Sequence, residues 1–219
     1  MDMLRLEYDI QHHLVLSKRH LRDHALIRTI ISTLSTSAEL KNICKRDLRK
    51  VRGKNFEFHT IKLSSPSRTR ISPIDQKTYE ILMSLNTSKP FQLSEEKIDE
   101  IVSKYSPADR KYNVKSLRKA MIRLLQDATL FEVEFEKLSL EEMYAYMLDF
   151  NPIYSGVWEF DDEEDVEEFI LNYADLTGSN AESIASKLGK DEDYVRKILE
   201  SGKKGLISFK NSKDRVFKV

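Results

Sequence analysis

Apolar side chains that recur every three to four residues constrain this chain most, because that spacing gives a helix one apolar face. The clearest example combines six such positions in one stretch: Val114, Leu117, Met121, Leu124, Leu125 and Ala128. Weaker forms of the pattern predict helices over 26–34, 40–48, 75–82 and 94–105, and one more beginning at Ser139. The chain is therefore expected to be mainly helical.

One stretch follows a different period. Residues 56–63 alternate, with Phe56 and Phe58 on one side and His59 on the other. A polar turn follows at 64–67, and the chain returns over 68–74. Alternation on both sides of a short polar turn is typical of a β-hairpin. The first domain, residues 1–158, is thus predicted to be helical with a small β-hairpin.

The last 60 residues predict a second domain over 159–219, with an acidic leading segment. Apolar spacing indicates a helix over 166–173, a short helix after the capping box of Ser179 and Glu182, and a third helix capped by Asp191. Two strands, 206–210 and 215–219, then pair across a polar turn. Three helices followed by a hairpin is the order of a winged helix-turn-helix domain, an α+β fold.

In a winged helix the third helix normally enters the major groove, and the wing touches phosphates. The residues expected to meet DNA are Tyr194, Arg196 and Lys197 on that helix, and Lys210, Lys213, Arg215 and Lys218 on the wing. Three carboxylates at 191–193 would repel phosphate at the helix start. A winged helix used for packing or dimerisation is the alternative.

The net charge is zero, but the charges are segregated along the chain. Residues 1–72 carry 15 basic against 7 acidic side chains, whereas 131–176 carry 1 against 15. Eight of the ten residues 159–168 are acidic. This segregation favours double-stranded DNA as a partner of the basic parts. The acidic segment 159–168 could bind a basic protein partner, or simply keep exposed helices in water.

Several classes of protein and of binding site are not expected for this chain. No run approaches the ~20 apolar residues of a membrane span, and charges interrupt the N-terminus where a signal peptide would be apolar. Cys44 is the single cysteine, which fits a cytoplasmic protein (nucleoid-associated, or nuclear in a eukaryote).

His20 and His24 have a metal-ligand spacing but no clear third ligand, so no metal is expected. No glycine-rich phosphate loop occurs, and no cofactor is expected. A homo-oligomer is compatible with the sequence.

Residues 14–158 resemble the catalytic domain of the tyrosine recombinases, the phage integrase family. The matching pieces are Arg22-Asp23-His24-Ala25-Leu26, Glu39-Leu40, Ile43, Asp47-Leu48, Arg70-Ile71-Ser72-Pro73-Ile74 and Lys115-Ser116-Leu117-Arg118. The resemblance implies a tyrosine-recombinase-like fold and DNA as the substrate. It rests on the order and spacing of these pieces.

The family's chemistry, however, needs residues that this chain has lost. Its enzymes hold the scissile phosphate with two arginines, a lysine and histidines while a tyrosine attacks. Here the first arginine position is Thr36 and the first histidine position is Lys115, whereas the second arginine is kept as Arg118. Lys62 could serve as the hairpin lysine, and Tyr154 is the candidate nucleophile by position. Removing one clamping cation costs on the order of 10²-fold in rate.

The sequence therefore predicts a DNA-binding protein that does not cut DNA, acting as a regulator or as an accessory architectural factor. One alternative is an active strand transferase with a rearranged site built from Arg118, Lys62, Lys115 and Tyr154. The other is a protein-interaction module that binds a basic partner.

Overall fold

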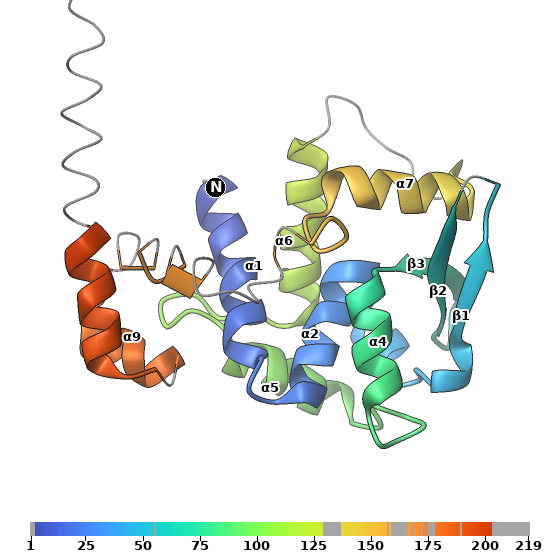
Figure 1. Ribbon diagram of the computed structural model, residues 1–219. Coiled ribbons are helices and arrows are strands. Elements are labelled where there is room, and N and C mark those ends of the chain that lie inside the picture. Colours follow the sequence, from blue (N-terminus) through green and yellow to red (C-terminus); the bar gives the residue numbers. More distant parts are fainter. Residues whose placement is uncertain are drawn as a thin grey trace, which may run out of the picture. The chain divides into compact units, whose positions relative to one another are not determined.

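Two helices with long apolar faces form the centre of the first of two units, residues Met1–Glu159, in the computed structural model. Helix α2 (Leu21–Thr33) buries Leu26, Ile27 and Ile30 completely. Helix α6 (Val114–Asp127) buries Leu117 and Met121 in the same way. The two helices contact each other, and helix α1 (Met3–Ser17) packs against both of them (Figure 1). The strongest apolar periodicities of the sequence thus mark the core.

The structure describes residues 3–54, 56–128, 137–156, 158, 166–167, 169–171, 173–174, 178–188 and 190–202. Besides α2 and α6, its elements are α1 (Met3–Ser17), α3 (Ser37–Leu40), the 3-10 turn η1 (Lys45–Asp47), β1 (Leu48–Arg52), β2 (Glu57–Ser64), β3 (Thr69–Ile74), α4 (Gln76–Ser84), α5 (Glu95–Lys104), α7 (Leu140–Phe150) and α9 (Ala181–Leu188). None of the helices in these ranges is both long and apolar enough to cross a membrane. The fold is mainly helical with one small sheet.

The sheet has three antiparallel strands in the order β1-β2-β3. The predicted hairpin is confirmed as β2 and β3, in which Ile61 pairs with Ser72. The predicted helix over 40–48 is wrong. Helix α3 ends at Leu40, and the Lys45 amide donates to the Ser88 carbonyl (2.9 Å) instead of continuing a helix. The chain then enters β1, whose Leu48 pairs with Ile61.

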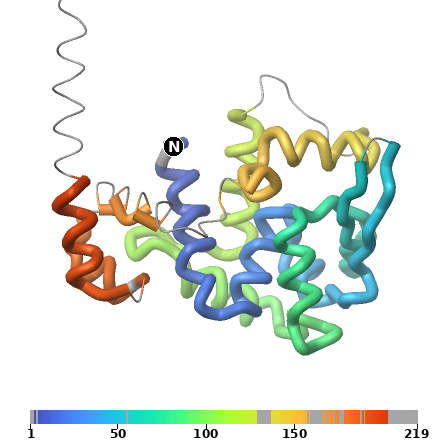
Figure 2. The backbone as a smooth tube through the Cα atoms, viewed as in Figure 1, coloured from blue at the N-terminus to red at the C-terminus, as the bar shows by residue number. Residues whose placement is uncertain are grey.

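Helices cover both faces of the sheet. The His59 ring of β2 lies 4.0 Å from the Tyr79 ring of α4, whereas the neighbouring Phe58 stacks on Tyr144 of α7 at 5.0 Å. Successive side chains of a strand point to opposite faces, so α4 and α7 lie on opposite sides of β2. Strand β3, at one edge of the sheet, contacts both α2 and α7 (Figure 2).

Helix α1 was not predicted, yet it is tied into the unit by a buried carboxylate. Asp9 is fully buried and accepts hydrogen bonds from Arg5 (2.8 Å), Arg110 (3.0 Å) and the Tyr112 hydroxyl (2.7 Å). A buried charge is tolerated only when it is paired and hydrogen-bonded, as Asp9 is. The network fixes α1 against the segment that leads into α6.

His13 is buried beside this network, and its ring donates from Nδ1 to the Asp9 carbonyl (2.6 Å). Burial lowers the pKa of His13 to about 4. In the unfolded chain a histidine titrates near 6.5, so between these pH values the unfolded state binds more protons. Stability is therefore complete above about pH 6.5 and falls as the pH drops towards 4. His13 should make the free energy of unfolding about 2 kcal/mol lower at pH 5 than at pH 7.

Urea unfolding at the two pH values measures this difference, and a His13→Gln variant should lose about that much of the pH dependence. An equal pH dependence in both proteins would show that His13 does not titrate between the folded and unfolded states.

The second unit spans Phe160–Val219. Its described part holds helical residues within 166–174, helix α9 and a helix over 192–202. The amide of Tyr194 is capped by Asp191 (3.1 Å), as the sequence predicts, whereas α9 is capped by Asn180, not by the expected Ser179–Glu182 box. Both expected strands of the wing, 206–210 and 215–219, lie outside the described residues.

Candidate functional site

An unusual backbone conformation at Leu34 lies at the start of a recess of the first unit that three arginines line. Leu34 is the C-cap of α2 and adopts a left-handed conformation (φ 54°), alone among the described residues other than glycine. Such a conformation costs roughly 1–2 kcal/mol for a residue with a Cβ atom. It ends α2 and leaves the carbonyls of Thr33 and Leu34 available to side chains. Strain of this kind is often kept where a site requires it.

Arg70 of β3 lies against these carbonyls. Its guanidinium donates to the Thr33 carbonyl (3.0 Å) and, more distantly, to that of Leu34 (3.4 Å). It also pairs with Glu39 of α3 at 2.8 Å. Burial alone would raise the pKa of Glu39, but hydrogen bonds from Arg70 and Thr36 outweigh it and hold that pKa below its usual value. Glu39 is therefore ionised and neutralises one arginine charge.

Arg118 of α6 reaches the same place from the other side. Its Nε donates to the Leu34 carbonyl at 2.7 Å. Within the described part of the chain its two Nη groups donate no hydrogen bond and it forms no ion pair. Burial, and then the charges of Arg70 and Arg68, lower the pKa of Arg118, although an arginine remains charged at any physiological pH. Arg118 thus offers donors to a ligand from a site that is already positive.

Arg68, an exposed residue that follows the β2–β3 turn, completes a cluster of three arginines. Arg68 and Arg118 both line a second hollow of about 450 Å³ beside Thr36 and the turn at 65–67. Glu39 pairs with Arg70, and the Arg118 guanidinium forms no ion pair within the described residues. Arginine's planar fork of donors matches phosphate and carboxylate oxygens.

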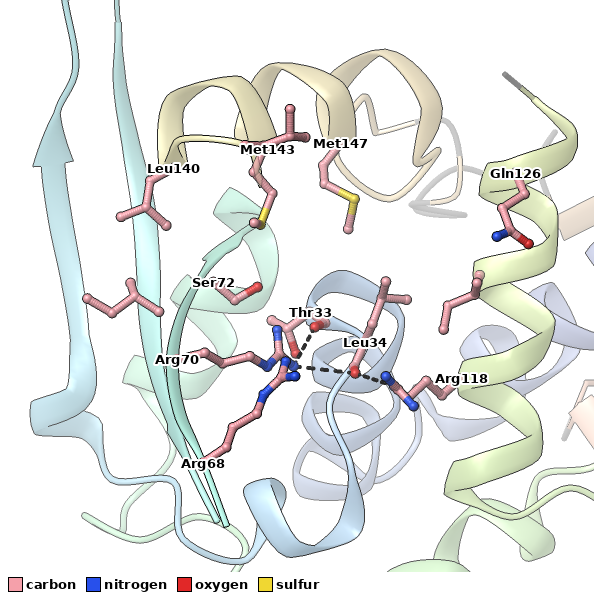
Figure 3. A pocket seen from close by; sticks show the side chains of 13 residues that line it. Thr33, Leu34, Arg68, Arg70, Ser72, Arg118, Gln126, Leu140, Met143 and Met147 are labelled. Carbon is pink, nitrogen blue, oxygen red and sulfur yellow. Dashed lines mark hydrogen bonds between the residues drawn. The ribbon is translucent and has the colours of Figure 1, made fainter. Parts of the chain in front are cut away.

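The three arginines, named here the arginine cluster, form one end of a cavity of about 530 Å³ (Figure 3). Its other walls come from α2, β3, α6 and α7, together with the chain just before α7. They are made by Thr33, Leu34, Ile71, Ser72, Ile122, Gln126, Leu138, Leu140, Met143 and Met147. The cavity therefore has a cationic end and a largely apolar body, which is the usual composition of a small-ligand site.

Two of the predicted lysines lie near this cavity. Lys115 is exposed in the first turn of α6 and precedes Arg118 by three residues, so both lie on one side of the helix. Lys62 pairs with Ile71 across β2 and β3. Directly paired residues point to the same face, so Lys62 shares the face of Ile71, a cavity residue. Both lysines are exposed, and neither lines the cavity.

Thr36 and Tyr154 have other roles. Thr36 caps α3 and forms a capping box with Glu39. The Tyr154 hydroxyl donates to the Ser32 carbonyl at 3.0 Å, and the ring lies 5.7 Å from that of Tyr144. Burial raises the pKa of Tyr154 well above its ordinary value. Tyr154 is not among the residues that line the cavity.

The predicted DNA contacts of the second unit divide into two groups. Tyr194, Arg196 and Lys197 lie in the helix over 192–202. Arg196 pairs there with Glu192 and with Asp193 (2.9 Å), so its charge is balanced within its own helix. The residues Lys210, Lys213, Arg215 and Lys218 lie outside the described residues.

The two histidines with metal-ligand spacing are separated by their environments. His24 is buried and hydrogen-bonded to Ser17 (2.9 Å), whereas His20 is exposed. Within the described ranges no group of three or more histidine, cysteine or acidic side chains could hold a metal ion.

Sequence reasoning singled out Arg118 but missed two members of the cluster, Arg68 and Arg70, and the methionine wall of α7. The Arg70-x-x-Pro73 spacing was a usable signal for Arg70, because it had already been matched to the recombinase pattern. For Met143 and Met147 no signal separates a cavity wall from ordinary core.

The fold and the cavity together define a mainly helical protein with a three-stranded antiparallel sheet and an arginine-lined recess. Over 211 residues the chain is 50% identical to an uncharacterized protein of Archaeoglobus fulgidus, a match that covers 96% of this chain and 99% of the relative. The chain therefore belongs to the same family as that archaeal protein. No protein-family model and no solved structure matches it.

Proposed function

We propose that the chain binds double-stranded DNA through its phosphates and does not cut it, as a regulator or an accessory architectural factor. The observation that carries the proposal is the arginine cluster, in which Arg68, Arg70 and Arg118 meet beside Glu39. Arg118 is also the position where the resemblance to tyrosine recombinases expects a phosphate contact. On this proposal residues 1–158 are a degenerate relative of that family, and the second unit is a winged helix whose wing adds phosphate contacts.

The charge on α6 supports a polyanionic partner. The helix has four basic side chains and no acidic one before its last residue, Asp127. Lys115, Lys119 and Arg123 are exposed and form no ion pair within the described part of the chain. Exposed basic side chains without an acidic partner attract DNA phosphates over about one Debye length, ~10 Å at 0.1 M salt.

The surroundings of Tyr154 argue against strand cleavage. A tyrosine that attacks phosphate must lose its proton, and burial makes that loss more difficult by raising the pKa. Its hydroxyl is also engaged by the Ser32 carbonyl. With Thr36 at the first arginine position, the site has a binding surface for phosphate but no nucleophile prepared to react.

Fluorescence anisotropy with a labelled random-sequence duplex tests the binding. Affinity should fall steeply between 50 and 200 mM salt on a log–log plot, with about 0.9 of slope for each phosphate contact. Changing Arg118 to Ala should reduce the slope by about one contact. Affinity that does not depend on salt, or no binding at low salt, would exclude DNA as the partner.

A nicked suicide substrate tests the absence of chemistry, because a recombinase leaves its tyrosine covalently joined to DNA. We expect no adduct that survives denaturation, in the wild-type protein or in Tyr154→Phe. An adduct abolished by Tyr154→Phe would instead establish strand transfer, and would place Arg118, Lys62 and Lys115 at the reacting phosphate.

A further inference from the structure

The apolar body of the cavity has no role in binding a duplex backbone. Phosphates on the outside of a helix would touch the arginine cluster, whereas the recess behind it is lined by Leu34, Ile71, Ile122, Leu140, Met143 and Met147. Ile71, at 50% exposure, is among the most exposed large apolar residues described. At about 530 Å³ the cavity lies within the ~300–1,000 Å³ typical of small-ligand sites. A ligand that fills it must join an anion to a less polar body.

The methionines indicate what kind of body fits. Met143 and Met147 are four residues apart on α7 and so present both thioethers to the same wall. In Figure 3 both side chains point from α7 into the cavity, above the arginines. Thioether sulfur makes favourable contacts with aromatic rings, and the flexible methionine side chain adapts to the shape of what it contacts. This wall suits a planar ring.

A polar group lies where the far edge of such a ring would be. Gln126 lines the cavity from α6, eight residues beyond Arg118, or about 12 Å along the helix axis. Figure 3 shows it at the opposite end of the cavity from the arginine cluster. A carboxamide both donates and accepts hydrogen bonds, which matches the edge of a nucleobase. A plain hydrocarbon chain would gain nothing from it.

We propose that the cavity holds one unstacked nucleotide, with its phosphate on the arginine cluster, its base against Met143 and Met147, and the base edge at Gln126. This inference rests on the proposed function and narrows it, because DNA with an unpaired nucleotide then binds better than a perfect duplex. Extruding a paired base costs the energy of its pairing and stacking, and an unpaired base avoids most of that cost.

Three DNAs test the proposal by anisotropy: a 20-base-pair duplex, the same duplex with one bulged adenosine, and one with an abasic bulge. We expect the bulged adenosine to bind at least about tenfold more tightly than the paired duplex, and the abasic bulge to show no such gain. Met143→Trp, which fills the recess, should abolish the preference for the bulged adenosine. Gln126→Ala, at an exposed position, should reduce the preference in the same way.

A free nucleotide has the same ring and phosphate as an unpaired nucleotide of DNA and could occupy the same cavity. Calorimetry with adenosine 5′-monophosphate and with inorganic phosphate separates the two sources. Tighter binding of the nucleotide that Met143→Trp removes, without a preference for the bulge, would support the site with a free nucleotide as its ligand. If neither the bulge nor the nucleotide is preferred, the nucleotide site is excluded, while a salt-dependent duplex affinity would leave the proposed function intact.

Discussion

Arg118→Glu should weaken binding of duplex DNA by about 10- to 100-fold at 0.1 M salt. A hydrogen bond to a charged group contributes roughly 1.5–3 kcal/mol, and 1.4 kcal/mol corresponds to a factor of ten. The substitution removes the guanidinium whose Nη groups make no other bond within the described part of the chain. It also places a carboxylate beside Arg70 and Arg68, where it can pair with them and occupy the phosphate position.

The matched control is Lys97→Glu on α5, which makes the same change of charge at an exposed residue that lines none of the hollows described. Lys97→Glu should bind DNA within about threefold of the wild type, since a distant surface charge is largely screened. Circular dichroism melting should confirm that both variants fold. Equal affinities of the two variants would show that the arginine cluster is not the phosphate site.

The helices of the core could be predicted from the sequence because their signals are local. Helices α4, α5 and α7 begin where the sequence predicts, and they are capped by Asp75, Ser94 and Ser139, whose side chains each accept from the amide three residues later. A cap and an apolar face both act within a few residues, so they can be found without knowing the fold. The same reasoning found β2 and β3.

Strand β1 could not be predicted in this way, and helix α1 was missed. Apolar Leu40, Ile43 and Leu48 fit a helical spacing, but the backbone donor of Lys45 bonds to Ser88, more than forty residues away. Such a long-range bond leaves no trace in a local pattern. Helix α1 has a local signal that was missed, since the buried Leu6, Ile10 and Leu14 recur every four residues. Only its ties from Asp9 to Arg110 and Tyr112 span about a hundred residues.

The candidate site was predicted only where a residue had a family position. Arg118 was found because a motif surrounds it, whereas Arg68 joins the cluster through the turn between β2 and β3. The left-handed Leu34, whose carbonyl accepts from Arg118, had no signal at all, since glycine or asparagine is the residue expected in that conformation. Four elements that are separate in the sequence, α2, β3, α6 and α7, form the site. Only the fold brings them together, so no local pattern could predict the site.

The second large effect concerns stability. Asp75→Ala should lower the free energy of unfolding by about 3–5 kcal/mol, the usual cost of removing one member of a buried ion pair. Arg28 and Asp75 are 1% and 2% exposed and lie 2.7 Å apart. Asp75 also caps α4 through the Thr78 amide (2.9 Å), and its own amide donates to Ser32 (3.0 Å). Removing the carboxylate would leave the Arg28 charge buried opposite an apolar side chain.

A double-mutant cycle separates the ion pair from the cap. Asp75→Asn keeps an oxygen for the Thr78 amide, and Arg28→Met replaces the guanidinium with an apolar chain of similar length. Each single change should cost about 3 kcal/mol in urea unfolding at pH 7, and the double change much less than their sum, because neither charge is then left unpaired. Additive losses would mean that the two groups stabilise the fold independently.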